Sequence, residues 1–209
     1  AQTQGVHFSI DEKTKIAYAL DNLGVDYIEG GWPGANPTDT EFFQKDHKFK
    51  NAKLTSFGMT KRSGRSADND PGLSALLNAN TPAVCLVGKS WDFHVDIALE
   101  ISNEENLENI KESANHFVKA KKEFMFDAEH FFDGYKANPK YAVQCIKAAY
   151  DSGARWVVLC DTNGGTLPHE VTRIVSEVAK IIPGKNLGIH AHNDTGNAVS
   201  NSLAAVLSG

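Results

Sequence analysis

Two histidines separated by a single residue, His190 and His192, form the pattern with the clearest chemical meaning in this sequence of 209 residues. They end a segment that we predict to be a short strand. Because successive side chains on a strand point to opposite faces, both imidazoles would lie on one face, close enough to share a cation. Neutral imidazole is a common ligand of Zn, Mn, Fe and Ni. The pair therefore predicts half of a metal site, although one buried and one surface histidine would give the same pattern.

Acidic side chains close two other segments where we predict strands to end. Glu29 closes the segment 25–29, and Asp127 and Glu129 close the segment 124–129, where they share one face. A carboxylate in such a place could act as a general acid or base, or could hold a neighbouring group, and we assign this role to Glu129. The alternative is a glutamate that caps a helix or lies at the surface.

The segment from Asp161 to Gly165 places a carboxylate, the Thr162 hydroxyl and two glycines directly after a further apolar run. Glycine permits tight turns and a close approach of the backbone, so this segment could receive an anionic ligand. It could also be a simple connection in which Thr166 caps the next helix. Glu29, followed by two glycines, repeats the pattern earlier in the chain.

Other polar residues give weaker indications. The basic segment 57–65 could meet a carboxylate or a phosphate, or could be a mobile, solvated loop. His94, His116 and His169 show no partner pattern, and we expect them to be structural or exposed.

Composition predicts one ordinary globular domain, with 41% hydrophobic and 22% charged residues. The net charge of −5 argues against a nucleic-acid partner, and we expect the basic run 119–122 to follow a helix instead. No apolar run is long enough to span a bilayer. Cys85, Cys145 and Cys160 lack the spacing of a metal or redox motif, and two of them lie in apolar runs, which favours a reducing cytoplasm.

Strand-like segments alternate with helical ones along the whole chain. Ser9 and Glu12 form a capping box for a first helix that Gly24 ends. The strand-like segments recur every ~26 to 41 residues, the spacing of a βα unit, without hairpin signals. We predict strands over 25–29, 54–57, 83–87, 124–129, 156–161 and 187–192, and further helices over 38–48, 71–77, 104–119, 139–152, 169–181 and 197–207.

This alternation predicts an α/β fold with a parallel sheet. An open, doubly wound sheet would fit the number of elements, but the chain contains no G-x-G-x-x-G fingerprint after an early strand. The polar residues recur at the carboxyl ends of the strands, which converge on one mouth in a (βα)8 barrel. We therefore predict a TIM barrel that is incomplete in this chain, with the first and last strands missing, and one domain over 1–209.

Several motifs resemble the catalytic barrel of the α-isopropylmalate, homocitrate and citramalate synthase family. The resemblance extends over essentially the whole chain, and the motifs at 30–34 and 129–135 resemble the citramalate synthase branch most closely. The residues that carry it are Gln2–Val6, Tyr27–Gly34, Phe126–Tyr135, Cys160–Gly165 and His190–Asp194.

The resemblance implies a metal-dependent, Claisen-type condensation of acetyl-CoA with a 2-oxo acid, in branched-chain amino-acid biosynthesis. Pyruvate is the favoured oxo acid, giving citramalate, and 2-oxoisovalerate is the next. The resemblance also implies a homodimer. A divalent cation (Mn, Mg, Zn or Co) would polarise the ketone of the oxo acid. Related alternatives are an acyl-CoA lyase of the same barrel type and a non-catalytic barrel subunit.

Site residues carry over from the family by position. His190 and His192 match its two metal-binding histidines, Glu129 matches the glutamate near the reacting carbonyl, and Thr162 matches the position that binds the carboxylate of the oxo acid. We also assign Glu29 to substrate binding. The family's Arg-Asp-Gly stretch, which completes the metal site, has no match before Gln2. We therefore expect the chain to be a piece of a longer enzyme and to be inactive in isolation.

Overall fold

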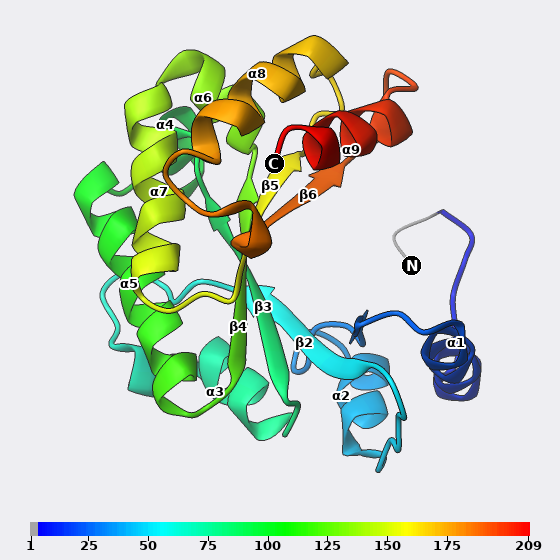
Figure 1. Ribbon diagram of the computed structural model, residues 1–209. Coiled ribbons are helices and arrows are strands. Elements are labelled where there is room, and N and C mark those ends of the chain that lie inside the picture. The colour runs from blue at the N-terminus through cyan, green and yellow to red at the C-terminus, as the bar shows by residue number, and fades with distance from the viewer. Residues whose placement is uncertain (1–3) are drawn as a thin grey trace.

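A curled sheet of six parallel strands forms the centre of the computed structural model, which describes residues 4–209 (Figure 1). The strands pair in the order in which they follow one another along the chain, so β1 and β6 form the two edges. Their bounds are β1 Tyr27–Glu29, β2 Lys53–Met59, β3 Ala83–Lys89, β4 Glu123–Glu129, β5 Trp156–Asp161 and β6 Leu187–Ala191. All six predicted strands are confirmed, and the incomplete barrel that they form confirms the predicted fold class.

Helices cover the convex face of the sheet, and α1 lies at the side where the chain begins, packed against α2 and β1 (Figure 1). Each of the seven predicted helices is present, although the second ends at Gln44, four residues earlier than predicted. The α-helices are α1 Ile10–Leu23, α2 Pro37–Gln44, α3 Pro71–Asn78, α4 Asp92–His94, α5 Asn103–Lys119, α6 Phe131–Ala137, α7 Pro139–Asp151, α8 Pro168–Val178 and α9 Ala198–Leu207. Among the residues described, no helix combines the length and apolar composition needed to cross a bilayer.

Local sequence explains where the helices begin and end. The capping box predicted at Ser9 is present, because Glu12 N–H donates to the serine side chain while the Glu12 carboxylate accepts from Ser9 N–H. Gly24 ends the same helix in the left-handed conformation, with φ 89°. Four other helices, α2, α3, α7 and α8, begin with proline, whose fixed φ and missing N–H suit the first turn. Gln2 and Thr3 of the N-terminal motif lie outside the described residues.

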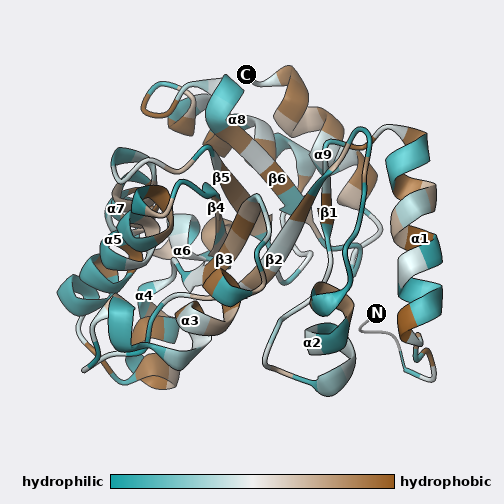
Figure 2. Cartoon of the chain, turned by 90° about the horizontal axis from the view of Figure 1, so that it is seen from below, coloured by the Kyte–Doolittle hydropathy of each residue, from teal (hydrophilic) through white to brown (hydrophobic). Residues whose placement is uncertain are grey.

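The two faces of the sheet have different environments. The convex face packs against the helices through a large apolar core in which Phe117, Phe126 and Phe132 are fully buried. Hydrophobic residues accordingly gather in the central strands β3, β4 and β5 (Figure 2). A smaller cluster lies on the concave face, formed by Ala83, Cys85 and Met125 with Tyr27, Phe57 and Trp156 packed against it. This small cluster forms the apolar layer of the concave face, and polar side chains lie beyond it toward both ends of the strands.

A polar network crosses the amino-terminal end of the concave face. Tyr27 hydrogen-bonds Glu123, which also pairs with Lys53, and Trp156 Nε1 donates to the Tyr27 hydroxyl at 3.1 Å. These contacts pair polar side chains that come from β1, β2, β4 and β5. They therefore fix these four strands to one another below the apolar cluster.

Sequence patterns missed the short helices that follow β3 and β4. In α4 and the π-helix Val95–Leu99, a few residues turn directly after β3, and in α6 the apolar Phe131 and Phe132 continue the apolar run of β4. His130 separates β4 from α6 by adopting a left-handed backbone, with φ 55°. Such a break at a single non-glycine residue leaves no signal in composition.

Gly134 should be required for the close contact between α6 and the end of β3. A Cβ at this position would lie 2.5 Å from Ser90 O and 2.9 Å from Trp91 Cα, which are backbone atoms that cannot move aside cheaply. We expect Gly134→Ala to lower the free energy of unfolding by about 1–3 kcal/mol, as overpacking does, even after the gain in helix propensity. The measurement is chemical denaturation. Gly165→Ala is the control, because a Cβ there meets nothing within 4 Å, and an equal loss in both variants would contradict the prediction.

Candidate active site at the carboxyl ends of the strands

Alternation along the parallel strands gathers the predicted site residues into one cavity of about 980 Å³. The register pairs Val87 with Asp127, Lys89 with Glu129, and Cys160 with His190, so these side chains lie on the concave face. The cavity is lined by all five predicted site residues, namely Glu29, Glu129, Thr162, His190 and His192, together with Asp127 and Cys160. The structure therefore brings together residues that are up to 163 positions apart in the sequence (192 minus 29).

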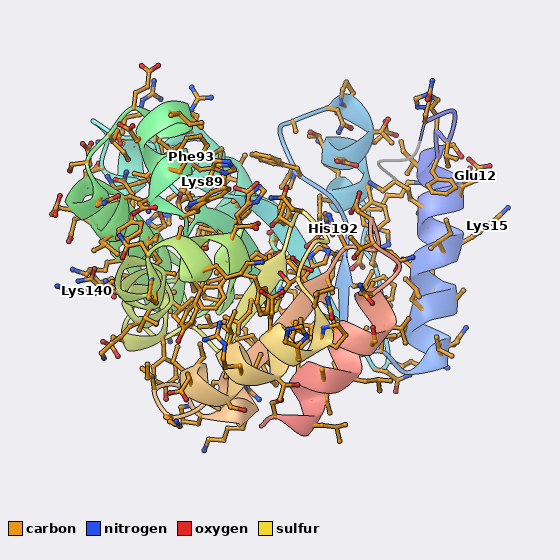
Figure 3. The ribbon with its side chains drawn as sticks, turned by 90° about the horizontal axis from the view of Figure 1, so that it is seen from above. Glu12, Lys15, Lys89, Phe93, Lys140 and His192 are labelled. Atoms are coloured by element: carbon orange, nitrogen blue, oxygen red, sulfur yellow. The ribbon has the colours of Figure 1, made fainter. Side chains whose placement is uncertain are left out.

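The two histidines lie side by side, as their spacing predicts. Their ring centroids are 5.0 Å apart, and both residues are exposed to the cavity. His192 lies just past β6 near the middle of the molecule (Figure 3), where its N–H donates to Asp161 O at 3.3 Å and so extends the strand pairing. Within residues 4–209 neither imidazole hydrogen-bonds another side chain. Each imidazole therefore has ring nitrogens available to bind a ligand or a metal ion.

A carboxylate and a thiol approach His190 from the neighbouring strands. The ligand atoms of Asp127, Cys160 and His190 all lie within 4.8 Å of one another. Burial raises the pKa of the Cys160 thiol well above its ordinary value, which keeps the sulfur protonated. Burial also raises the pKa of Asp127, against the opposing effects of the Cys85 thiol and of His190. The sequence predicted Asp127 near the site because it shares a strand face with Glu129. Cys160 was noted only as a cysteine within an apolar run.

Glu129 is held in place by an ion pair across β3 and β4. Its carboxylate contacts Lys89 Nζ, and both side chains are largely shielded from solvent, with exposed fractions of 26% and 21%. The backbone carbonyl of Glu129 also accepts a hydrogen bond of 2.7 Å from Ser90 Oγ. These contacts exclude a merely solvated surface glutamate.

Thr162 is oriented by a single backbone hydrogen bond. Its hydroxyl oxygen accepts from His130 N–H at 2.8 Å. Because that bond uses a lone pair of the oxygen, the hydroxyl hydrogen remains available to donate to a ligand in the cavity.

Asp161 does not belong to the cavity, although its place at the end of β5 indicated a polar rim. It is fully buried on the opposite face, where its carboxylate accepts from Thr166 Oγ1 at 2.8 Å and from Asn201 Nδ2 at 3.4 Å. The carboxylate therefore fixes the loop after β5 to α9. Side-chain alternation explains the difference, since Cys160 and Thr162 face inward and the residue between them must face outward.

Lys13 and Asp39, which lie beside Glu29 in the cavity wall, carry no signal in the sequence. Lys13 of α1 forms an ion pair with Asp39 of α2, and Asp39 also accepts from Trp32 N–H at 3.1 Å. All three residues line the cavity. The motif Tyr27–Gly34 contains Trp32, but only the tertiary structure shows that Lys13 reaches the same place.

The basic segment after β2 is an ordered connection rather than a mobile loop. Lys61 is buried, pairs with Glu112 at 3.1 Å and donates to Arg65 O at 2.8 Å. Asp70 accepts from Arg62 N–H at 2.9 Å. The Lys61 ammonium group is therefore already paired within the protein, which argues against its binding an external carboxylate or phosphate.

Histidines outside the site have structural surroundings, as expected for His94 and His116. The His94 ring packs edge-on against His130, with centroids 4.4 Å apart, and its pKa is lowered by burial and by the charge of His130. His116 Nδ1 lies 3.1 Å from an Asp68 oxygen. His169 is exposed on α8.

Comparison with known proteins places this architecture and these motifs in one family. The model of the HMGL-like family matches residues 1–209. The chain belongs to the HMGL-like family. It is 54% identical to the (R)-citramalate synthase of Aquifex aeolicus (strain VF5) and 50% identical to that of Geobacter sulfurreducens, in each case over the whole of this chain. A 2-isopropylmalate synthase of Sediminispirochaeta smaragdinae is 33% identical.

The chain spans about 40% of the length of these curated relatives. Among solved structures, the HMG-CoA lyase of Bacillus subtilis superposes with a TM-score of 0.82 over the whole of this chain and 70% of its own length, at 18% identity. The carboxyl transferase domain of Rhizobium etli pyruvate carboxylase gives 0.62 over 96% of this chain and 34% of its own, at 17% identity. These two likenesses concern the fold of this HMGL-like chain.

Glu29 should titrate near neutral pH. Its side chain is exposed to the cavity, but desolvation by the surrounding protein and, second, the negative charge of Asp127 raise the pKa of Glu29 from 4.5 to about 7. Asp127→Asn removes the repulsion but not the desolvation, so we expect the pKa of Glu29 to fall while staying above 4.5. Carboxyl ¹³C NMR titration measures it. Asp133→Asn, on α6, should leave the titration unchanged, and an ordinary pKa for Glu29 in the unmodified protein would contradict the prediction.

Proposed function

We propose that this chain is the catalytic barrel of a citramalate synthase, which condenses acetyl-CoA with pyruvate. The observation that carries the proposal is the convergence of Glu29, Glu129, Thr162, His190 and His192 in one cavity, in a chain up to 54% identical to proteins of that name. A 2-isopropylmalate synthase, which would use 2-oxoisovalerate, is the next candidate on the basis of its 33% identity. We also propose that residues 1–209 act as one domain.

The donor set of the cavity fits a divalent cation. His190 and His192 would hold it through imidazole nitrogens that have no other side-chain partner among the described residues, and the nearby Asp127 adds negative charge. Nitrogen and oxygen donors suit Mn, Zn or Co, and Mg where water and carboxylate dominate. When bound, the ion supplies Lewis acidity toward the ketone of the oxo acid.

Protein groups around the histidines account for the remaining requirements of the reaction. Condensation needs a proton removed from the acetyl methyl group and a proton delivered to the oxygen of the former ketone. Glu129, which Lys89 holds at the cavity wall, is our candidate to accept or position the transferred proton. Glu29, with a pKa of about 7, can hold or release one at neutral pH. The free Thr162 hydroxyl hydrogen would bind the carboxylate of the oxo acid.

We also propose a homodimer in a reducing compartment such as the cytoplasm. The three cysteines are free and buried, which supports a reducing environment, and the dimer follows from the family resemblance of the sequence.

Loss of either imidazole should weaken binding of the catalytic cation. We expect His190→Ala and His192→Ala each to raise the dissociation constant for Mn²⁺ by about tenfold or more, since even outer-shell partners of metal ligands typically change affinity 10–100-fold. The measurement is Mn²⁺ titration followed by electron paramagnetic resonance. His169→Ala is the control, because that residue is exposed on α8. Unchanged Mn²⁺ affinity in both site variants would reject the assignment.

Turnover should depend on Glu129 and on pyruvate. In the complete protein we expect release of the CoA thiol from acetyl-CoA when pyruvate is added, and a fall in kcat of about 10²–10⁴-fold in Glu129→Gln, the usual contribution of a general acid or base. Glu104→Gln is the matched control, because Glu104 is exposed in the first turn of α5. Thiol release with 2-oxoisovalerate but not pyruvate would replace the proposed substrate, and cleavage of an acyl-CoA without condensation would reject the synthase.

A further inference from the structure

We propose that Asp127, Cys160 and His190 form a second cation site, deeper on the concave face than the pair of histidines, which takes thiophilic divalent ions such as Zn²⁺, Cd²⁺ or Co²⁺. Their side chains come from the three adjacent strands β4, β5 and β6, and Cys160 and His190 are direct partners in the register. The site thus depends on rigid elements rather than on loops.

The spacing of the three donors is close to that of a metal site. Their ligand atoms lie within 4.8 Å of one another. Metal–ligand bonds of about 2.0–2.3 Å in a tetrahedral arrangement place donors roughly 3.5 Å apart. Small rotations about the side-chain bonds of Asp127 and His190 would close the difference, and a fourth position would remain for water.

The thiol determines which ions the site prefers. Thiolate and imidazole favour Zn²⁺ and similar soft or borderline ions, whereas Mg²⁺ and Mn²⁺ prefer oxygen ligands. Binding replaces the Cys160 S–H bond by a sulfur–metal bond and releases one proton to solvent. The Asp127 carboxylate offsets part of the charge of the ion, and the buried position of Cys160 limits the access of competing water to the new bond.

The shared His190 gives the second site a regulatory consequence. An imidazole nitrogen directed at an ion beside Cys160 cannot serve an ion held together with His192. A thiophilic ion would therefore compete with the catalytic cation and inhibit the enzyme. This consequence rests on the proposed function, whereas the existence of the thiol site does not.

Titration with Co²⁺ tests the site directly, because a cobalt–thiolate bond produces charge-transfer absorption in the near ultraviolet. We expect this absorption in the unmodified protein, in Cys145→Ser and in Cys85→Ser, and its loss in Cys160→Ser. Cys145 is the matched control, since it is buried in α7. Circular dichroism establishes that each variant is folded. Absence of the band from the unmodified protein, its persistence in Cys160→Ser, or its loss in Cys85→Ser alone would overturn the proposal.

The two histidines then separate the thiol site from the catalytic one. We expect His190→Ala to weaken Co²⁺ binding, followed by charge transfer, by about tenfold or more, and His192→Ala to leave it within about twofold. Mn²⁺ affinity should fall in both. If His192→Ala abolishes the charge-transfer band as well, only one cation site exists and the second site is rejected. If the charge-transfer band behaves as expected while Mn²⁺ affinity is unchanged in both variants, the assignment of the catalytic cation to His190 and His192 is rejected. The proposal of the thiol site is then retained.

Discussion

Alternation of side chains along parallel strands is the constraint on which every part of this site depends. Glu29, Asp127, Cys160 and His190 reach one cavity because each occupies an inward position near the carboxyl end of its strand. A shift of one strand by one residue would send its polar side chain into the apolar core and bring a core residue into the cavity. The aromatic core behind the sheet and the polar network at its opposite end both resist such a shift.

Electrostatic repulsion explains why the cavity suits a cation. Lys89 neutralises Glu129, and Lys13 pairs with Asp39. Glu29 and Asp127 lie near each other without such a partner among the described residues, and desolvation together with their mutual repulsion raises the pKa of Glu29 to about 7. A divalent ion close to Asp127 would relieve this repulsion. The arrangement is unfavourable for folding and favourable for binding, as is common where a protein builds a functional site.

Sequence patterns predicted the six strands and the residues at their ends well, because buried parallel strands carry long apolar runs and the chemistry follows directly after them. They failed where local sequence does not determine the direction of a side chain. Asp161 looks like a rim residue in the sequence, but its outward position turns it into an anchor for the loop and α9. Helix α6 was missed because its two phenylalanines extend the apolar run of β4. Lys13 reaches the cavity only through the placement of α1.

The bond from His130 N–H to Thr162 has a consequence for the thermodynamics of binding. His130 directly precedes α6, and α6 packs through Gly134 against the backbone just after β3, next to Lys89. The Thr162 hydroxyl and Lys89, the partner of Glu129, are thereby held by the same rigidly packed segment. Ligand binding then requires little ordering of side chains, so that most of the interaction energy is retained as affinity instead of being lost as conformational entropy.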